Sequence, residues 1–430
     1  MKACVYGLWH LGSVTAACLA KAGIDTVGLE HNADSVAKLN NGQAPLFEPG
    51  LDDLIASGLQ KRKLSFTCDS AAAISNADLV WVTFDTPVDD EDMADVDYVN
   101  SRVEGLFRYL RDGTIVLISS QVPVGNTAKL ESRFVAVANG RNVHFAYSPE
   151  NLRLGTAIKV FTDPGRIVVG VRNAETRARL EPLLSLFCDR LIWVSIEAAE
   201  MVKHAVNAYL ATCVTFINEI ASVCEMVGAD ASEVERALRS EPRIGEKAYI
   251  RPGAAFAGGT LARDVVFLGE LGKQKQLGLP LLTSIIPSNR QHSLWPLRQV
   301  RSRLGTLDGH IVAVLGLSYK PGTSTIRRSD AISLIRDLLV LGAKVHAYDP
   351  EVKTLPEEFA AVTLTPTAVE AAEGASCMVI STEWPAFREL RPDDLLKRLR
   401  RPLIVDINRF LDPAITTHPD IEFITFGKPA

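Results

Sequence analysis

The sequence predicts an α/β protein with two Rossmann-like, doubly wound domains joined by a long central helix and a helical region. Two observations support this prediction. Short apolar strand patterns alternate with helical patterns at both ends of the chain. Between them, Ile196–Gly228 carries apolar residues three and four positions apart, which indicates one long buried connecting helix that ends at its first glycine. We expect three domains, covering residues 1–195, 196–300 and 301–430.

The N-terminal segment predicts a strand, helix and strand unit, with strands at Lys2–Tyr6 and Asp25–Glu30 and a helix over 13–23. More strands with helical segments between them give the rhythm of a doubly wound sheet, whose ligands bind beyond the carboxyl ends of the strands. These further strands are Leu79–Thr83, Ile115–Ser119, His144–Tyr147 and Arg166–Val171.

The turn after the first strand is a candidate dinucleotide site. Gly7 and Gly12 frame a G-x-W-x-x-G sequence that would place a pyrophosphate at a helix N-terminus. Glu30, after the second strand, can accept both ribose hydroxyls, which favours NAD over NADP. Trp9 replaces the glycine that lets the backbone approach the phosphates, so its indole must point away from the cofactor or shift it. The alternative is an ordinary strand-to-helix turn.

The C-terminal half predicts a helix at Ala231–Arg239, then a glycine-rich loop from Arg243 that can close over a ligand, and a helix that begins at Asp264. A second Rossmann-like set of elements follows. Its strands are His310–Leu315, Lys344–Asp349, Cys377–Ile380 and Leu403–Ile407, with a helix at Ala331–Leu341.

Composition excludes several classes of function. A net charge of −5 and a pI near 6.0 provide no electrostatic footprint for nucleic acid or an anionic membrane surface. The seven cysteines are scattered, and no C-x-x-C pair occurs, so we expect neither a disulfide framework nor a metal site. The chain has no uninterrupted apolar run of transmembrane length. We therefore expect a cytoplasmic protein without a membrane or nucleic-acid partner.

Lys203 and Asn207 are the first catalytic candidates, because residues four apart project from one face of a helix. A cation and an amide aimed the same way can hold an oxyanion or a hydroxyl. Taken alone, such a pair is more often a solvated charge and a surface amide.

Ten sequence motifs in this order resemble the nucleotide-sugar 6-dehydrogenase family, which includes UDP-glucose and GDP-mannose dehydrogenases. The resemblance covers essentially the whole chain. The matching stretches are PLFEPGL from Pro45, DTP from Asp85, SQVPVGNT from Ser120, SPENLRLGTA from Ser148, EMVKHAVNAYLA…FINE from Glu200, RIGEK from Arg243, RPGAAFAGGTLARD from Arg251, GLSYKPGTSTIRRS from Gly316, YDP from Tyr348 and TEW from Thr382.

The resemblance implies an N-terminal NAD domain, a central helix that also builds a homodimer, and a C-terminal nucleotide-sugar domain. It also implies an activity: NAD oxidises the C6 alcohol of a UDP-sugar twice, through a thiohemiacetal and a thioester, in the supply of polysaccharide precursors. Within the family, the motifs most resemble those of the UDP-glucose 6-dehydrogenases.

The family motifs also imply roles for residues of this sequence. Lys203 and Asn207 would hold the C6 oxygen, Asp264 would lie beside the reacting water, and Glu150 is a candidate acid or base. The cofactor-binding candidates are Gly7, Leu11, Gly12, Glu30, Thr86, Gln121 and Arg263. The substrate-binding candidates are Leu152, Arg153, Lys203, Asn207, Arg243, which would reach into the partner subunit's site, Tyr249, Gly253, Phe256, Gly259 and Lys320, which would contact sugar or phosphate.

The sequence departs from the family where the second oxidation takes place. Thr260 occupies the position of the nucleophilic cysteine, which makes it a catalytic position with altered chemistry. A threonine hydroxyl needs a dedicated base and forms an ester rather than a readily hydrolysed thioester. Further departures are Gln121 for threonine, Leu154 for an acid, Arg263 for lysine and Asn408 for arginine.

Two hypotheses follow from these observations. The first is an NAD-dependent, UDP-glucose 6-dehydrogenase-like enzyme that stops at the aldehyde or oxidises the aldehyde hydrate without a covalent intermediate. The second is a nucleotide-sugar-binding or assembly protein that kept the fold and lost turnover, which Trp9 and Thr260 favour. Oxidation of an unrelated nucleotide-linked alcohol is a third possibility.

Overall fold

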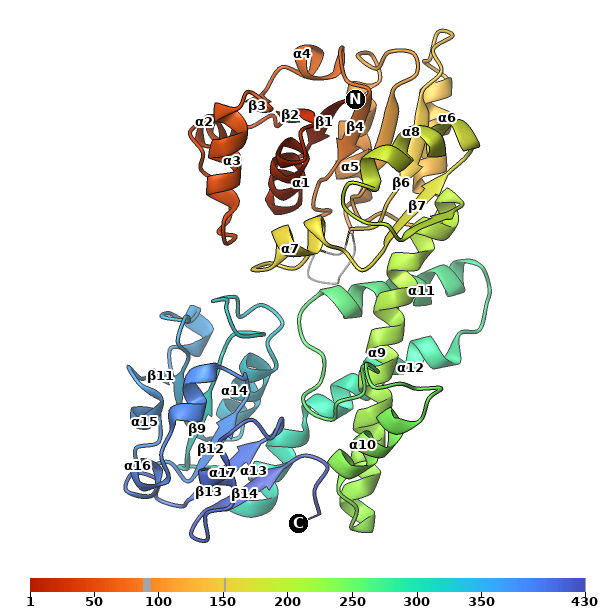
Figure 1. Cartoon of the computed structure of the whole chain (residues 1–430). Helices are drawn as coiled ribbons and strands as arrows, with labels where there is room; N and C mark the ends of the chain where they lie inside the picture. Colours follow the sequence, from red (N-terminus) through yellow and green to blue (C-terminus); the bar gives the residue numbers. More distant parts are fainter. Residues whose placement is uncertain (88–93, 151, 430) are drawn as a thin grey trace. The chain divides into compact units, whose positions relative to one another are not determined.

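The structure is a computed structural model that describes residues 1–87, 94–150 and 152–429. The chain divides into two compact units, Met1–Ala205 and Val206–Ala430, and Figure 1 follows them along the sequence. Each unit contains a sheet of the Rossmann type, and a long helix lies between the two sheets in sequence. The predicted fold class is therefore confirmed.

The first unit contains an eight-stranded sheet in the order β3-β2-β1-β4-β5-β6-β7-β8. Strands β1 to β6 are parallel in the order 3-2-1-4-5-6, which is the arrangement of dinucleotide-binding sheets. By contrast, β7 is antiparallel to β6, and β8 is parallel to β7. The strands are β1 (Lys2–Tyr6), β2 (Asp25–Leu29), β3 (Leu64–Thr67), β4 (Leu79–Val82), β5 (Ile115–Ile118), β6 (His144–Tyr147), β7 (Ile167–Val171) and β8 (Leu191–Val194).

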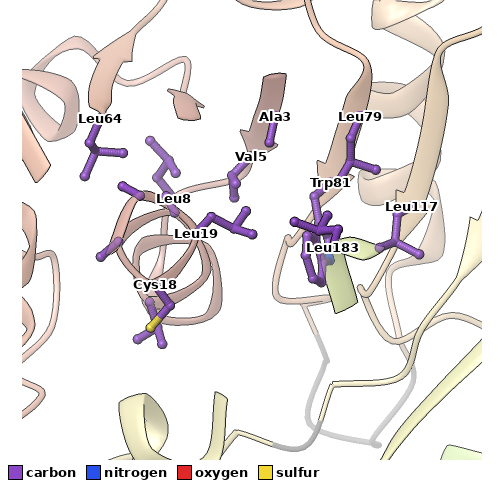
Figure 2. Close-up of a cluster of buried hydrophobic side chains, with 14 of the residues drawn as sticks. Ala3, Val5, Leu8, Cys18, Leu19, Leu64, Leu79, Trp81, Leu117 and Leu183 are labelled. Carbon is purple, nitrogen blue, oxygen red and sulfur yellow. The ribbon is translucent and has the colours of Figure 1, made fainter. Parts of the chain in front are cut away.

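Helices cover both faces of this sheet, and β1 shows why. Successive residues of a strand point to opposite faces. Ala3 and Val5 pack in a core with α1, α3 and α8, part of which Figure 2 shows, whereas Cys4 and Tyr6 pack in a core with α4, α5 and α6. The helices are α1 (His10–Lys21), α2 (Ala33–Asn40), α3 (Leu51–Gln60), α4 (Ser70–Ile74), α5 (Val96–Leu106), α6 (Asn126–Val135), α7 (Ala157–Thr162) and α8 (Ala174–Leu184).

The long helix α9 (Ile196–Val227) has the predicted extent to within one residue. The prediction that it is buried is wrong for one face. Tyr209, Phe216 and Val223 follow one another at intervals of seven residues and are 66%, 48% and 57% exposed. Apolar periodicity marks positions on a helix, but it does not say which of them a neighbouring element covers.

By length and apolar composition alone, α9 could also cross a membrane. Its polar side chains argue for a core helix instead. Glu200, His204 and Asn207 are buried and make hydrogen bonds to other elements of the protein. Such contacts satisfy polar groups that a lipid environment would leave unpaired.

The second unit begins with helices and continues into a six-stranded parallel sheet in the order β11-β10-β9-β12-β13-β14. Its helices are α10 (Ala231–Ser240), α11 (Thr260–Gln274), α12 (Pro280–Ser293), α13 (Trp295–Leu304), α14 (Asp330–Val340), α15 (Ala368–Ala371), α16 (Pro392–Leu396) and α17 (Pro413–Thr416), and short 3₁₀ turns cover Glu357–Phe359 and Pro385–Glu389. Its strands are β9 (Ile311–Leu315), β10 (Lys344–Tyr348), β11 (Thr363–Leu364), β12 (Cys377–Ile380), β13 (Leu403–Asp406) and β14 (Glu422–Thr425).

Some boundaries differ from the prediction. The helix expected to begin at Asp264 begins one turn earlier, at Thr260, directly after Gly259. Since no side chain caps this helix start, the sequence carries no capping signal there. The strands β3, β8, β11 and β14 were not predicted. They are short, and none is buried along its whole length. β3, β11 and β14 contain polar residues that weaken their apolar pattern, whereas β8 (LIWV) is apolar throughout and was missed.

Candidate active site

The turn between β1 and α1 has the geometry of a phosphate-binding turn. Gly7 has a φ of +95°, and its N–H donates to the carbonyl oxygen of Leu29 at 3.1 Å. A Cβ on Gly12 would lie 1.8 Å from the Gly7 oxygen, so only glycine lets α1 start this close to the strand. The side chain of Trp9, the N-cap residue of α1, is 51% exposed and therefore lies outside the core. The turn can present its N–H groups to a pyrophosphate.

Glu30 directly follows β2 and lies beside this turn. Its Oε2 accepts a hydrogen bond from the Leu8 N–H at 3.1 Å, and its Oε1 accepts one from the His31 N–H at 2.7 Å. Oε1 also accepts a longer bond of 3.4 Å from the Asn32 N–H, and Oε2 can accept a second bond. Because Glu30 is only half-buried, this position and chemistry fit a hydroxyl of a ribose.

Three other cofactor candidates lie at the same carboxyl edge of the first sheet or beside it. The Thr86 hydroxyl donates to the carbonyl oxygen of Gln121 at 2.6 Å, which joins the loops after β4 and β5. Leu11 lines a cavity of about 80 Å³ together with Glu150 and Leu152. The first unit therefore brings together six of the seven predicted cofactor residues, and the seventh, Arg263, lies on α11 in the second unit.

Lys203 and Glu150 form a partly buried pair in the first unit. The ammonium donates to the backbone oxygen of Glu150 at 2.8 Å and lies 3.4 Å from its Oε1, and the two side chains are 11% and 27% exposed. The other carboxylate oxygen accepts from the Leu152 N–H at 2.9 Å. A carboxylate held beside a cation in this way can accept the proton of a bound hydroxyl group.

Asn207 and Asp264 form the corresponding pair in the second unit. The Asn207 amide donates to the Asp264 carboxylate, and the residues are 6% and 0% exposed. Thr260 is the first residue of α11 and is exposed, one helical turn before Asp264. One member of each pair lies on α9, where Lys203 and Asn207 are one turn apart.

A loop of the second unit is held by neutral polar side chains. The Gly253 N–H donates to Asn218 Oδ1 at 3.1 Å, and the Asn289 amide makes bonds of 3.0 Å with both the N–H and the carbonyl oxygen of Phe256. Burial lowers the pKa of His292, whose Nε2 donates to the Gly253 oxygen at 2.7 Å. These bonds fix the backbone of the RPGAAFAGG stretch.

Asn408 holds the same loop from the other side. Its Oδ1 accepts from the Ala254 N–H at 2.8 Å. A Cβ on Gly253 would lie 2.4 Å from that oxygen, which explains the glycine. Asn408 therefore has a structural role in the second unit.

This loop lines a cavity of about 550 Å³ in the second unit. Its walls contain four of the predicted substrate residues, Tyr249, Gly253, Phe256 and Lys320. The volume lies within the range of small-molecule sites. Three cationic side chains, those of Lys320, Arg239 and Arg251, also line it, together with the acids Asp330 and Glu383. Arg251 pairs with Glu383 at 3.1 Å, and the cations suit a diphosphate.

Other predicted substrate residues lie outside the cavity walls. Arg243 is 89% exposed in its side chain and pairs with Glu241 Oε1 at 2.7 Å. Arg153 is exposed in the first unit, and Gly259 immediately precedes α11. Among the described residues, no group of three or more His, Cys, Asp and Glu side chains could hold a metal ion.

Three family models match the chain in the order of these sites. They are described as the NAD binding domain, the central domain and the UDP binding domain of the UDP-glucose/GDP-mannose dehydrogenase family, and they match residues 1–187, 197–291 and 313–413. The chain belongs to this family.

Similar proteins agree with the family assignment. The chain is 32% identical over 438 residues to a UDP-glucose 6-dehydrogenase from Rhizobium meliloti (strain 1021), with 100% of both chains covered. It is 32% identical over 434 residues to the UDP-glucose 6-dehydrogenase TuaD from Bacillus subtilis (strain 168), which covers 100% of this chain and 94% of TuaD. The solved structure of a UDP-glucose dehydrogenase from Pyrobaculum islandicum matches with a TM-score of 0.87 at 28% identity and covers 100% and 98% of the two chains.

Membership of this dehydrogenase family confirms the predicted enzyme class, an NAD-dependent oxidoreductase that acts on the CH–OH group of a UDP-sugar. The NAD binding domain covers the turn at Gly7 and the acid at Glu30. The UDP binding domain covers Lys320 and part of the wall of the 550 Å³ cavity.

Sequence reasoning missed several residues that shape these sites. Glu200 is fully buried, which raises its pKa, and it accepts hydrogen bonds from the Thr127 N–H and hydroxyl at 2.9 and 2.7 Å. It therefore holds the SQVPVGNT stretch. Asn218, Asn289 and His292 lie inside helices, where an amide or imidazole gives no local sequence signal. Glu48 could have been noticed as an acid within the PLFEPGL motif.

Proposed function

We propose that the chain oxidises the C6 alcohol of UDP-glucose, or of a close UDP-sugar, to the aldehyde and then releases it. NAD bound at the first unit would accept the hydride from C6, while the hydroxyl proton leaves to a base. One alcohol and one NAD give one aldehyde, one NADH and one proton. The observation that carries the proposal is Thr260, at the first position of α11 and one turn before the buried Asp264.

The pairs Lys203 with Glu150 and Asn207 with Asp264 would supply the acid and base groups of this step. Lys203 and Asn207 would hold the C6 oxygen as negative charge develops on it, and Glu150, 3.4 Å from the Lys203 ammonium, would receive the proton. Asp264 would position a water molecule or the aldehyde hydrate. For cofactor binding we propose Gly7, Leu11, Gly12, Glu30, Thr86, Gln121 and Arg263.

For the UDP-sugar, we propose contacts from the cavity residues Tyr249, Gly253, Phe256 and Lys320, whose positions in one wall support the assignment. The further contacts that we propose are Leu152, Arg153, Gly259 and, across a dimer, Arg243.

Thr260 would stop the reaction because the second oxidation lacks a thiol. A threonine hydroxyl is far less nucleophilic than a thiolate near neutral pH. Cys213, on α9, is buried in an apolar cluster with Ile217 and Ile250 and does not replace the missing thiol. The aldehyde would therefore leave without forming a thioester.

A panel of UDP-, GDP- and TDP-sugars tested with NAD would establish substrate and turnover. We expect NADH absorbance to rise with UDP-glucose or a close UDP-sugar, and an aldehyde that hydroxylamine traps. Tight UDP-sugar binding without any NADH would instead favour the binding or assembly protein, which the exposed Trp9 at the cofactor turn and Thr260 support.

The substitution Thr260→Cys would test the position of this residue. If it lies at the sugar site, UDP-glucose should protect the new thiol from maleimide several-fold. Thr306→Cys, at an exposed position outside the cavity walls, is the matched control and should be labelled equally with and without the sugar. Unprotected labelling of the residue-260 thiol would contradict the proposed role.

We also propose a cytoplasmic homodimer formed through α9, organised as three domains with the boundaries 1–195, 196–300 and 301–430. The exposed stripe of Tyr209, Phe216 and Val223 supports the dimer, because so much apolar surface on one helix face suits a partner. Sedimentation should show a dimer for the wild type and a shift to monomer for Phe216→Asp. An unshifted dimer would place the interface elsewhere.

A further inference from the structure

Glu48 is a buried carboxylate that joins two distant stretches of the first unit. It is 4% exposed and lies just before α3. Its Oε2 lies 3.0 Å from Nε2 of His10 and accepts from the Gly155 N–H at 2.7 Å. Its Oε1 accepts from the Ala157 N–H at 2.8 Å. One side chain therefore holds three groups from two parts of the chain.

One end of this link is the cofactor turn. His10 is the first residue of α1 and follows Trp9 in the turn between the two glycines. Because an ionised carboxylate only accepts hydrogen bonds, Nε2 of His10 must carry the donated hydrogen. The imidazole side chain is 14% exposed, so the bond is shielded from solvent and fixes the ring against the carboxylate.

The other end is the segment after the candidate substrate residues Leu152 and Arg153. α7 begins at Ala157, and its N-cap residue Thr156 makes no side-chain cap bond. Glu48 takes the place of the cap, because it accepts the free N–H of Ala157 and that of Gly155. Without the carboxylate, the buried Ala157 N–H would lose the partner that the helix end does not provide.

We propose that Glu48 is a positioning residue that couples the NAD-binding turn to the 152–157 segment, so that NAD and the UDP-sugar strengthen each other's binding. The proposal rests on the proposed function in one respect, the assignment of Leu152 and Arg153 to the UDP-sugar. A carboxylate that bonds both stretches holds them in one arrangement. A ligand that orders one stretch then reduces the conformational entropy that is lost when a second ligand binds at the other stretch.

The test is a binding experiment with the non-reacting pair NADH and UDP on the full chain. NADH fluorescence titrations with and without saturating UDP give the coupling factor. In the wild type we expect UDP to tighten NADH binding about fivefold. In Glu48→Gln and in His10→Phe the factor should fall to near one. Glu104→Gln, which alters an exposed pair with Arg133, should keep the wild-type factor.

His10→Phe is the sharper variant, because it leaves both backbone bonds of Glu48 intact and UDP affinity without NADH should stay within about twofold of wild type. If Glu48→Gln does not fold, His10→Phe still tests the proposal. A wild-type coupling factor in His10→Phe, or no coupling in the wild type itself, would overturn the proposal.

Arg153→Ala separates this proposal from the proposed function on which it rests. If UDP affinity is unchanged in Arg153→Ala while His10→Phe abolishes coupling, the link through Glu48 holds and the assignment of Arg153 to the UDP-sugar fails. If UDP affinity falls in Arg153→Ala and coupling persists in His10→Phe, the assignment holds and the link fails.

Discussion

The two sheets of the molecule begin in the same way. A glycine follows the first strand of each, Gly7 after β1 and Gly316 after β9, with φ values of +95° and +86°. In both, the glycine N–H donates to the last carbonyl oxygen of the second strand, at 3.1 Å from Leu29 and 2.8 Å from Tyr348. An acid then follows that second strand, Glu30 in the first sheet and Asp349 in the second.

The two acids are used differently. Glu30 is half-buried and accepts three N–H bonds, one of them 3.4 Å long, so its Oε2 can still accept a hydroxyl of a ribose. Asp349 is 2% exposed, and its oxygens are occupied by groups of the protein. The donors are the N–H groups of Leu317, Ser318, Glu351 and Val352, the Ser318 hydroxyl and the Trp384 indole.

The chain after each glycine also differs. In the first sheet α1 begins at His10, so a helix N-terminus faces the turn, whereas in the second sheet α14 begins only at Asp330. The intervening loop contains Lys320, which lines the 550 Å³ cavity. The same strand, glycine and acid arrangement is thus followed in the first unit by a turn suited to a dinucleotide. In the second unit it is followed by a loop that contains Lys320, and the acid stabilises the fold.

Gly12→Ala should have the largest effect. The added Cβ would lie 1.8 Å from the Gly7 oxygen, so α1 would have to move away from β1. We expect a loss of about 3 kcal/mol in the free energy of unfolding and a loss of NADH affinity of at least about tenfold. Gly105→Ala in α5, where no atom lies within 4 Å of the added Cβ, is the control and should be neutral or stabilising. Equal behaviour of the two variants would contradict the close helix start.

Asp349→Asn should lower stability without affecting NADH affinity. Burial raises the pKa of Asp349, but its many N–H donors outweigh this, and the net effect is a pKa below the ordinary 3.8. The stabilisation is therefore present above about pH 4 and is lost as the pH falls through the folded-state pKa. Urea unfolding should show a cost of about 2 kcal/mol at pH 7 that shrinks below pH 4. A cost that does not change with pH would argue against the ionised acid.

Glu30→Gln should lower NADH affinity without lowering stability. It removes one of the acceptors for a ribose diol, and we expect NADH affinity to fall about tenfold, equivalent to about 1.4 kcal/mol, with little change in the unfolding midpoint. Fluorescence titration measures the affinity, and Glu104→Gln provides the control. If Glu30→Gln bound NADH like the wild type, the proposed difference between the two acids would not hold.

Lys320→Met should have the smallest effect, confined to the second unit. Its ammonium lies 5.6 Å from the centre of the Tyr319 ring and lines the cavity. Loss of one solvent-accessible cation near a diphosphate should weaken UDP binding about fivefold and leave NADH binding unchanged, as calorimetry can measure. Lys344→Met, at an exposed position that starts β10, should change neither. Normal UDP affinity in Lys320→Met would show that this residue does not contribute to UDP binding.

The sequence predicted the elements whose signals are local. β1, the glycine turn and the acid at Glu30 are contiguous, and their geometry follows from strand, turn and helix preferences. The extent of α9 followed from its uninterrupted period and from Gly228. A helix start such as Thr260 lacks a capping side chain and so could not be located.

Long-range contacts explain what the sequence could not predict. Glu48 lies 107 residues from Gly155 in sequence, and Asn408 lies 154 residues from Ala254, yet each pair is hydrogen-bonded. A local sequence pattern carries no information about contacts between residues so far apart in the chain. For the same reason, the apolar period of α9 could not show that Tyr209 and Phe216 are exposed.

The most direct test of the central claim is the number of NADH molecules formed for each UDP-glucose consumed, with the product identified by mass spectrometry. With Thr260 in place of a thiol, we predict one NADH per sugar and a trappable aldehyde. Two NADH per sugar with the uronic acid as product would contradict the claim that this residue blocks the second oxidation.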